Sequence, residues 1–204
     1  VVNSDYGVVM SKNWKDSTFR FCIEGAYGSF LSNHLKKKNY SFSFLDIGAN
    51  QGLYTLIKCK NPNCKNTTCF EPVKSTFLLL VKNIHLNKIS TKCSALNLGL
   101  GKEPNIQSIF IKKNHSGAAS LIPHFDNNEQ VIKDSIEIVS SRIFSDLAIS
   151  KYRHSITCKI DVEGKEMDVI ETLVESEIFS LIDAVFYEVN ENWLNSLKLE
   201  TILK

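Results

Sequence analysis

Hydrophobic and polar positions follow two periods along this chain, one typical of strands and one typical of helices. From residue 42 onward, short apolar runs are followed by segments whose apolar residues recur at about every 3.6 positions. The pattern predicts strands at 42–47, 67–70, 92–98, 155–160 and 184–189, and helices at 52–59, 74–87 and 165–174. Strands that alternate with helices favour an α/β fold with a mostly parallel central sheet flanked by helices.

The chain before this repeat has a different pattern. Residues 1–40 are predicted to form an N-terminal strand and helix extension, with a short hairpin, a strand over residues 19–23 and a helix from about 29 to 38. The lysines at 36–38 complement the dipole at the end of that helix, and we expect them to be solvated. Residues 41–204 then form the ligand-binding domain, so that the whole is a single compact domain.

The strand and helix rhythm changes between residues 101 and 141. Residues 107–112 and 135–140 alternate like strands, and a polar stretch at 113–130 separates them. That stretch is too long for an ordinary hairpin turn, and long connections in compact domains are often functional. We therefore expect a lid or an acceptor-binding loop here.

Composition narrows the class of protein. Hydrophobic residues at 43% and charged residues at 23% are ordinary globular values. The 24 basic residues are nearly balanced by 22 acidic ones, which makes nucleic acid an unfavourable partner.

The longest apolar run, Phe77–Val81, is far shorter than the roughly 20 residues of a membrane span. The chain does not begin with methionine and shows no secretory signal pattern, and we expect a domain fused to others in a longer polypeptide.

The six cysteines have no spacing typical of a zinc site. Cys59, Cys64 and Cys69 are five positions apart, and no paired histidines lie nearby. Cys69 and Cys158 lie inside apolar runs, where free cysteine behaves as a small buried hydrophobe. Reduced thiols of this kind indicate a cytoplasmic protein.

The strongest local motif runs from Phe44 to Tyr54, where a predicted strand enters a glycine turn and then a helix. Ligands of open α/β sheets bind at such turns. A dinucleotide fingerprint would place glycine at 48, 50 and 53, but the chain has Gly48, Asn50 and Leu53. Asp46 is unfavourable beside a pyrophosphate and suits a cationic amino-acid moiety such as that of S-adenosylmethionine.

Further carboxylates follow the other predicted strands. Glu71 ends the second strand, where an acidic side chain can accept both ribose hydroxyls of an adenosine. Asp161 and Glu163 follow the strand at 155–160, and Glu188 ends the last one. These last three would repel one another unless they are protonated, paired with a base or bridged by a cation. For Glu163 and Glu166, an alternative is that they complement the dipole of the next helix.

Together these motifs resemble the FkbM-type methyltransferases. The matching elements, in order, are Asp-Ile-Gly-Ala-Asn-Gln-Gly at 46–52, Phe-Glu-Pro at 70–72, Ser-Gly-Ala-Ala-Ser at 116–120, Lys-Ile-Asp-Val-Glu-Gly at 159–164 and the Glu188 strand. The resemblance implies a Rossmann-like class I methyltransferase fold and S-adenosylmethionine as cofactor. The cofactor-binding residues we expect are Asp46, Gly48, Asn50, Gly52, Tyr54, Glu71, Pro72, Asn97 and Asp161.

The resemblance also implies O-methylation of a hydroxyl, often on a sugar. Candidates for the catalytic base are Asp161, Glu163, Glu188 and His115, and a magnesium ion across Asp161 and Glu188 would serve the same end. The acceptor could instead be a nucleic acid or another small molecule. A nucleic-acid amine methyltransferase usually has an Asp-Pro-Pro-Tyr-like turn, where this chain has Asp161-Val-Glu-Gly. A further alternative is a catalytically silent domain that binds cofactor and docks a glycosyltransferase.

One departure from the usual pattern concerns the end of the sheet. The chain stops at Lys204, soon after the fifth predicted strand, and the closing antiparallel pair of the class is not obvious. Either the strands between 107 and 140 complete the central sheet, or the chain is short.

Overall fold

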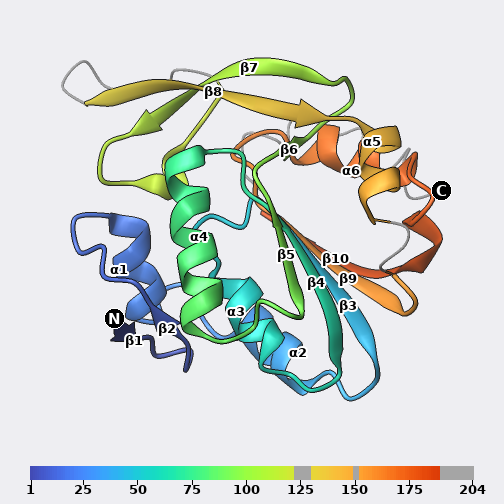
Figure 1. Cartoon of the computed structure of the whole chain (residues 1–204), viewed down its shortest axis with the longest axis horizontal. Coiled ribbons are helices and arrows are strands. Elements are labelled where there is room, and N and C mark those ends of the chain that lie inside the picture. Colours follow the sequence, from blue (N-terminus) through green and yellow to red (C-terminus); the bar gives the residue numbers. More distant parts are fainter. Residues whose placement is uncertain (122–129, 149–151, 189–204) are drawn as a thin grey trace.

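A computed structural model describes residues 1–121, 130–148 and 152–188 (Figure 1). Its centre is a five-stranded sheet in the order β10-β9-β3-β4-β5, and all four strand pairs are parallel. The strands are β3 (Phe42–Ile47), β4 (Cys64–Phe70), β5 (Cys93–Leu96), β9 (Ser155–Ile160) and β10 (Ile182–Tyr187). The predicted parallel α/β sheet is thus confirmed, and every residue of β3 is buried, as expected for a central parallel strand.

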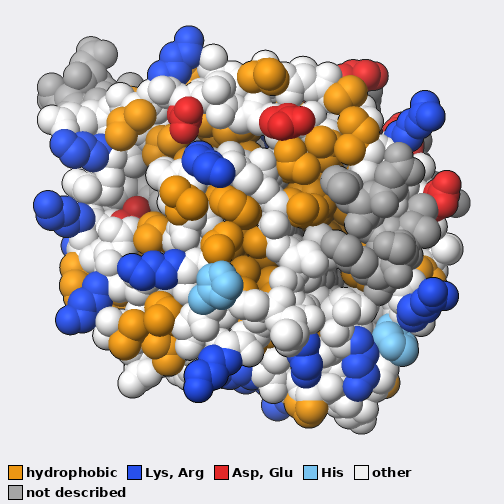
Figure 2. Space-filling view, in the orientation of Figure 1, with side chains coloured by type: hydrophobic (Ala, Val, Ile, Leu, Met, Phe, Trp, Pro, Cys, Tyr) orange, Lys and Arg blue, Asp and Glu red, His pale blue; other side chains and the backbone are white. Residues whose placement is uncertain are grey.

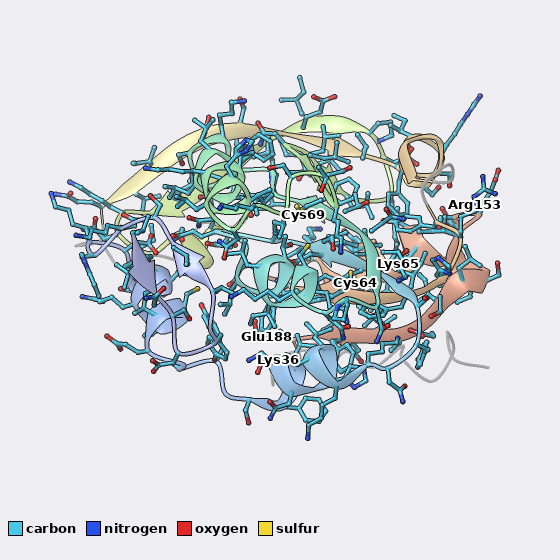
Figure 3. All side chains as sticks on the ribbon, turned by 60° about the horizontal axis from the view of Figure 1, so that its bottom comes forward. Lys36, Cys64, Lys65, Cys69, Arg153 and Glu188 are labelled. Atoms are coloured by element: carbon cyan, nitrogen blue, oxygen red, sulfur yellow. The ribbon has the colours of Figure 1, made fainter. Side chains whose placement is uncertain are left out.

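Helices cover both faces of this sheet. They include α3 (Leu53–Cys59), α4 (Lys74–Leu86), α5 (Ser141–Ala148) and α6 (Glu166–Val174). One hydrophobic cluster joins α3 and α4 to Cys69, and another joins α6 and Phe144 of α5 to β3 and β9. The burial predicted for Cys69 and Cys158 is confirmed, and Figure 3 shows Cys64 and Cys69 along β4. The hydrophobic pattern did not predict α5, a short helix anchored by Phe144, whose ring lies 5.7 Å from that of Phe70.

The strands expected between 107 and 140 form a separate sheet instead of completing the central one. This second sheet has the order β6-β8-β7, with β6 (Gly99–Leu100), β7 (Asn105–Lys112) and β8 (Val131–Val139), and β7 and β8 pair antiparallel. It crosses the top of the view in Figure 1, and Figure 2 shows hydrophobic side chains exposed over this region. Part of the polar stretch between its long strands, residues 122–129, lies outside the described residues.

The N-terminal extension contains the predicted hairpin, formed by β1 (Val2–Asn3) and β2 (Val9–Met10), and the predicted helix, α2 (Phe30–Lys37). The strand predicted over residues 19–23 is wrong, because α1 (Ser17–Ile23) is a helix. The Asp16 carboxylate caps it by accepting a hydrogen bond from the Phe19 amide at 2.9 Å. Phe19, Cys22 and Ile23 then share one buried face at helical spacing.

Lys38 is not solvated as predicted. It follows the last residue of α2 and is 8% exposed. Its Nζ lies 2.6 Å from Asp183 of β10 and donates a hydrogen bond to Thr157 of β9. The ion pair therefore joins the extension to the edge of the central sheet.

The extension shares its core with the rest of the chain. Tyr6, Val8 and Met10 belong to the same hydrophobic cluster as residues of α3 and α4. The side chain of Asn83 in α4 accepts from the Ser11 amide at 2.8 Å, so polar contacts fix the same surface. In the part of the chain that the structure describes, no helix is long and apolar enough to cross a membrane.

Candidate active site

A cavity of about 460 Å³ lies at the carboxyl ends of β3, β4, β9 and β10. One side is closed by the second sheet, through side chains such as Ile109 and Ile138, and another by α1 and the loop at 115–117. Its volume is in the usual range for small-molecule sites. The lining includes eight of the predicted site residues: Gly48, Asn50, Glu71, Pro72, His115, Asp161, Glu163 and, at the end of β10, Glu188 (Figure 3).

The glycine turn brings the ends of β3 and β9 together. Gly48 has φ +73°, and a Cβ at this position would lie 1.8 Å from the backbone oxygen of Asp161. The next turn residue, Asn50, also has a positive φ of 50° and donates its amide to Glu71 Oε2 at 2.8 Å. The turn therefore places its backbone against both neighbouring strands.

Glu71 is held from both sides at the cavity wall. The side chain is 5% exposed, and its two oxygens accept hydrogen bonds from the amides of Asn50 and Val73 at 2.8 and 2.9 Å. Burial raises the pKa of Glu71 to about 7, against the opposing effect of these two amides. Further hydroxyl donors from a ligand would favour the charged form of this carboxylate.

Four of the predicted cofactor residues are not among those that line this cavity: Asp46, Gly52, Tyr54 and Asn97. Their contact with a cofactor stays a prediction. Asp46 lies inside β3, before the turn, and is fully buried. Its carboxylate accepts a hydrogen bond from Thr55 Oγ1 at 2.7 Å. Gly52 starts α3 with φ +92° and packs against Leu80. Asn97 donates to the carbonyls of Glu71 and Pro72 at 2.9 and 2.8 Å, and so supports the wall from behind.

Lys159 of β9 is a site residue that the sequence analysis did not single out. Its Nζ lies 3.2 Å from Asp161 and 3.5 Å from Asp46, and donates to the Gly48 carbonyl at 2.8 Å. Burial opposes the charge on Lys159, but Asp161 and Asp46 outweigh it and raise its pKa. A lysine inside a strand predicted to be buried was the available signal. Lys159 thus places an internal cation beside Asp46.

The predicted convergence of Asp161, Glu163 and Glu188 is confirmed, since their carboxylate oxygens lie within 4.8 Å of one another. The positive charge of Lys159 compensates the negative charge of Asp161. Glu163 has φ 51°, an uncommon conformation for a residue other than glycine. Burial, followed by Asp161 and Glu188, raises its pKa to about 7. Burial and Asp161 also raise the pKa of Glu188.

Glu166 has a structural role in the same turn. It is 3% exposed, and its carboxylate accepts hydrogen bonds from the amides of Val162 and Gly164 at 3.2 Å each. This first residue of α6 therefore organises the turn that presents Glu163.

The loop that carries His115 is fastened to α1 and to the glycine turn. Asp16 accepts from the Ser116 amide at 2.9 Å and from the Gln51 side chain at 3.0 Å. Ser116 Oγ also lies 3.0 Å from Asn50 Oδ1. Asp16 was not predicted as a site residue, because it precedes a segment that the pattern predicted to be a strand. It links the His115 loop to the turn that faces Glu71.

This parallel sheet, with a glycine turn after β3 and an acidic residue after β4, defines a Rossmann-like fold of the class I methyltransferase type. Residues 46–201 match the family model described as the Methyltransferase FkbM domain. The chain belongs to this family.

Two fungal methyltransferases are among its relatives. "Methyltransferase 1" of Beauveria bassiana (strain ARSEF 2860) is 27% identical over 175 residues, which are 78% of this chain and 69% of that protein. "Methyltransferase sdnD" of Sordaria araneosa is 28% identical over 172 residues, 72% of this chain and 66% of that protein. The chain thus spans about two thirds of the length of these relatives. The crystal structure of methyltransferase FkbM from Methylobacillus flagellatus KT is 14% identical, with a TM-score of 0.43 over 80% of this chain and 41% of that one.

Proposed function

We propose that this chain is an S-adenosylmethionine-dependent O-methyltransferase that acts on a hydroxyl of a sugar. The observation that carries the proposal is one cavity, in a member of the FkbM family, that is lined by two chemically different groups of residues. Glu71 and the glycine turn form the first group, which we assign as the cofactor end. Glu163 and Glu188 form the second group, which we assign as the acceptor end, and Asp161 adjoins both groups.

The residues at the first end suit a nucleoside with a ribose diol. Glu71 is an acceptor held rigidly at the wall, and Gly48 and Asn50 present backbone beside it. Asp161, paired with Lys159, offers a second carboxylate near the turn for the cationic amino-acid part. The bound cofactor would supply a methyl group on a sulfonium.

The residues at the second end suit removal of a proton from a hydroxyl. In methyl transfer, the acceptor oxygen forms a bond to the methyl carbon as the bond from sulfur to that carbon breaks, and the hydroxyl proton must leave. We assign this proton to Glu163, because a pKa of about 7 suits a base near neutral pH. Glu188 positions the hydroxyl, and His115 closes the cavity on the side of α1.

A magnesium ion across Asp161 and Glu188 would lower the pKa of the hydroxyl instead. Lys159 Nζ, 3.2 Å from Asp161, already supplies a positive charge there, and we therefore favour Glu163 as a direct base. A nucleic-acid acceptor is less favoured, because carboxylates dominate the acceptor end.

The test is incubation of the protein with methyl-labelled S-adenosylmethionine and a panel of glycans, read by mass spectrometry. We expect a mass gain of one methyl group on a sugar. Calorimetric titration with S-adenosylhomocysteine in parallel identifies a silent domain, which would bind the cofactor product and transfer nothing. Methylation of RNA or of an amine, with no transfer to any glycan, would contradict the proposed acceptor.

A further inference from the structure

Two aromatic side chains of the N-terminal extension line the cavity and are partly open to it. Phe21 is 38% exposed and Tyr27 is 43% exposed. Their ring centroids lie 6.1 Å apart in an edge-to-face arrangement, and the His115 ring lies 6.2 Å from Phe21. We call Phe21, Tyr27 and His115 the aromatic wall.

The rings of Phe21 and Tyr27 are partly exposed, unlike those of the aromatic residues in the hydrophobic core. Phe19, two positions before Phe21 on α1, is fully buried. An aromatic ring carries a large apolar surface, and one that stays open on a cavity wall provides contact area for a ligand. The aromatic wall therefore has a surface that packing inside the protein does not use.

The aromatic wall lines the same cavity as Asp161 and Glu163. A molecule that rests on the aromatic wall would thus have one edge near Asp161 and Glu163.

Charge on the cavity wall disfavours an anion. Six carboxylates line it among the described residues: Glu71, Glu103, Asp161, Glu163, Asp168 and Glu188. The two lysines that the structure places on this wall are both paired, Lys102 with Glu171 and Lys165 with Asp168 at 3.0 Å. An anionic group on the acceptor would meet these carboxylates without an unpaired lysine of this wall to balance it.

We infer that the aromatic wall is the acceptor subsite and that it takes a neutral pyranoside ring in preference to a uronate or a phosphorylated sugar. The C–H groups on one face of a pyranose carry partial positive charge, which suits the negative face of an aromatic ring. The face of the sugar packs on Phe21 and Tyr27 while one hydroxyl points to Glu163. This inference rests on the proposed function and specifies its substrate class.

The test compares Phe21→Ala and Tyr27→Ala with the control Phe30→Ala. Phe30 is 79% exposed on α2 and lies outside the cavity lining, so its loss removes a similar ring from a different place. Phe21→Trp is the conservative variant. The probes are methyl β-galactopyranoside and its uronate, methyl galactopyranosiduronate, each with labelled S-adenosylmethionine for turnover and with S-adenosylhomocysteine for saturation-transfer NMR.

We expect the neutral glycoside to bind and react, and the uronate to do so at least about ten-fold less well. Each alanine variant of the wall should raise KM for the glycoside about ten-fold, the scale of one aromatic contact, with kcat changed less than KM. Phe21→Trp should restore most of the affinity, and Phe30→Ala should change nothing. Calorimetric Kd values for S-adenosylhomocysteine should stay within two-fold throughout.

The other outcomes separate the two proposals. Glycoside methylation that is unchanged by Phe21→Ala and Tyr27→Ala, or equal use of the uronate, overturns the subsite and leaves the proposed function intact. Glycoside binding that depends on Phe21 without methyl transfer keeps the subsite and overturns the proposed function. Neither binding nor transfer with either sugar overturns both.

Discussion

At the scale of single residues, the site depends on how carboxylates are compensated. Asp161 has a buried lysine 3.2 Å away, whereas burial raises the pKa of Glu71 to about 7. Partial desolvation of the solvent-accessible Glu163, together with the neighbouring Asp161 and Glu188, raises its pKa to about 7 as well. The same side-chain type is therefore kept charged at one position and able to exchange a proton near neutral pH at two others. Cofactor binding and catalysis should both depend on pH for this reason.

Glu71 should make cofactor binding tighter as pH rises from 6 to 8. In the free protein its pKa is about 7, and a ribose diol that donates to it favours the charged form. Affinity for S-adenosylhomocysteine should then weaken by up to about ten-fold per pH unit below 7 and level off above it. Glu71→Gln should lose about 1–3 kcal/mol of binding at pH 8 and lose this pH dependence. The measurement is calorimetry, with the exposed Glu175→Gln as control, and equal Kd values for wild type and Glu71→Gln would refute the contact.

Glu163 should govern turnover. Above pH 7 it is mostly charged and can accept the hydroxyl proton, and we therefore expect kcat to rise through pH 7 and reach a plateau. Glu163→Gln should lower kcat at least about 10²-fold and leave the Kd of the cofactor product within a few-fold. Activity should persist in a chelator, since Lys159 already compensates Asp161. If chelation abolishes turnover and magnesium restores it, Asp161 and Glu188 are ligands and Glu163 is not the sole base.

At the scale of elements, the sequence predicts the strands and helices in which the spacing of hydrophobic residues matches the side chains that are buried. The predicted bounds of β3 and β9 coincide with the observed ones, because both strands are buried on two faces. The segment around Phe19 was predicted wrongly, since a helix of seven residues is too short to show a clear helical spacing of hydrophobic residues. This helix also depends on the cap from Asp16. The convergence of Asp161, Glu163 and Glu188 followed from the topology of a parallel sheet. The contacts of Lys159 and the link from Asp16 to Ser116 join distant segments, and no local pattern encodes them.

Asp16 should therefore contribute both to the stability of α1 and to the placement of the His115 loop. Asp16→Ala removes a helix cap and the acceptor of the Ser116 amide, and we expect a loss of about 1–2 kcal/mol in urea unfolding. Ser29→Ala is the matched control, because Ser29 precedes α2 and its side chain makes no cap hydrogen bond. That variant should lose less than about 0.5 kcal/mol. Equal stability of the two variants would show that the Asp16 contacts add nothing.

At the scale of the whole molecule, the N-terminal extension forms part of the single fold. Its residues share one hydrophobic cluster with α3 and α4, Lys38 joins it to β10, and Phe21 and Tyr27 line the cavity. Figure 1 shows α1 and the hairpin beside α4 on one side of the molecule. Stability and acceptor binding should thus both require this segment.

A substitution at Met10 tests whether the extension unfolds together with the rest of the chain. The side chain is fully buried, and Met10→Ala should lower the free energy of unfolding by about 2–5 kcal/mol. Leu56→Ala in α3, also fully buried in the same cluster, should cost a similar amount. The chain has two tryptophans, and Trp14 is the one in the extension, so the experiment uses a background in which Trp193 is replaced by Phe. Unfolding followed by circular dichroism and by the fluorescence of Trp14 should then give coincident transitions. An earlier transition in fluorescence alone would show that the extension unfolds separately.

The close approach at Gly48 has a genetic consequence. The atom that a Cβ would meet at 1.8 Å is the backbone oxygen of Asp161, which no change of side chain can remove. At Gly99, by contrast, the obstacle is Ile138 Cδ1 at 2.5 Å, and this atom is absent from valine. A defect caused by Gly99→Ala should therefore have a second-site suppressor in Ile138→Val, whereas a selection for suppressors of Gly48→Ala should recover only reversion to glycine.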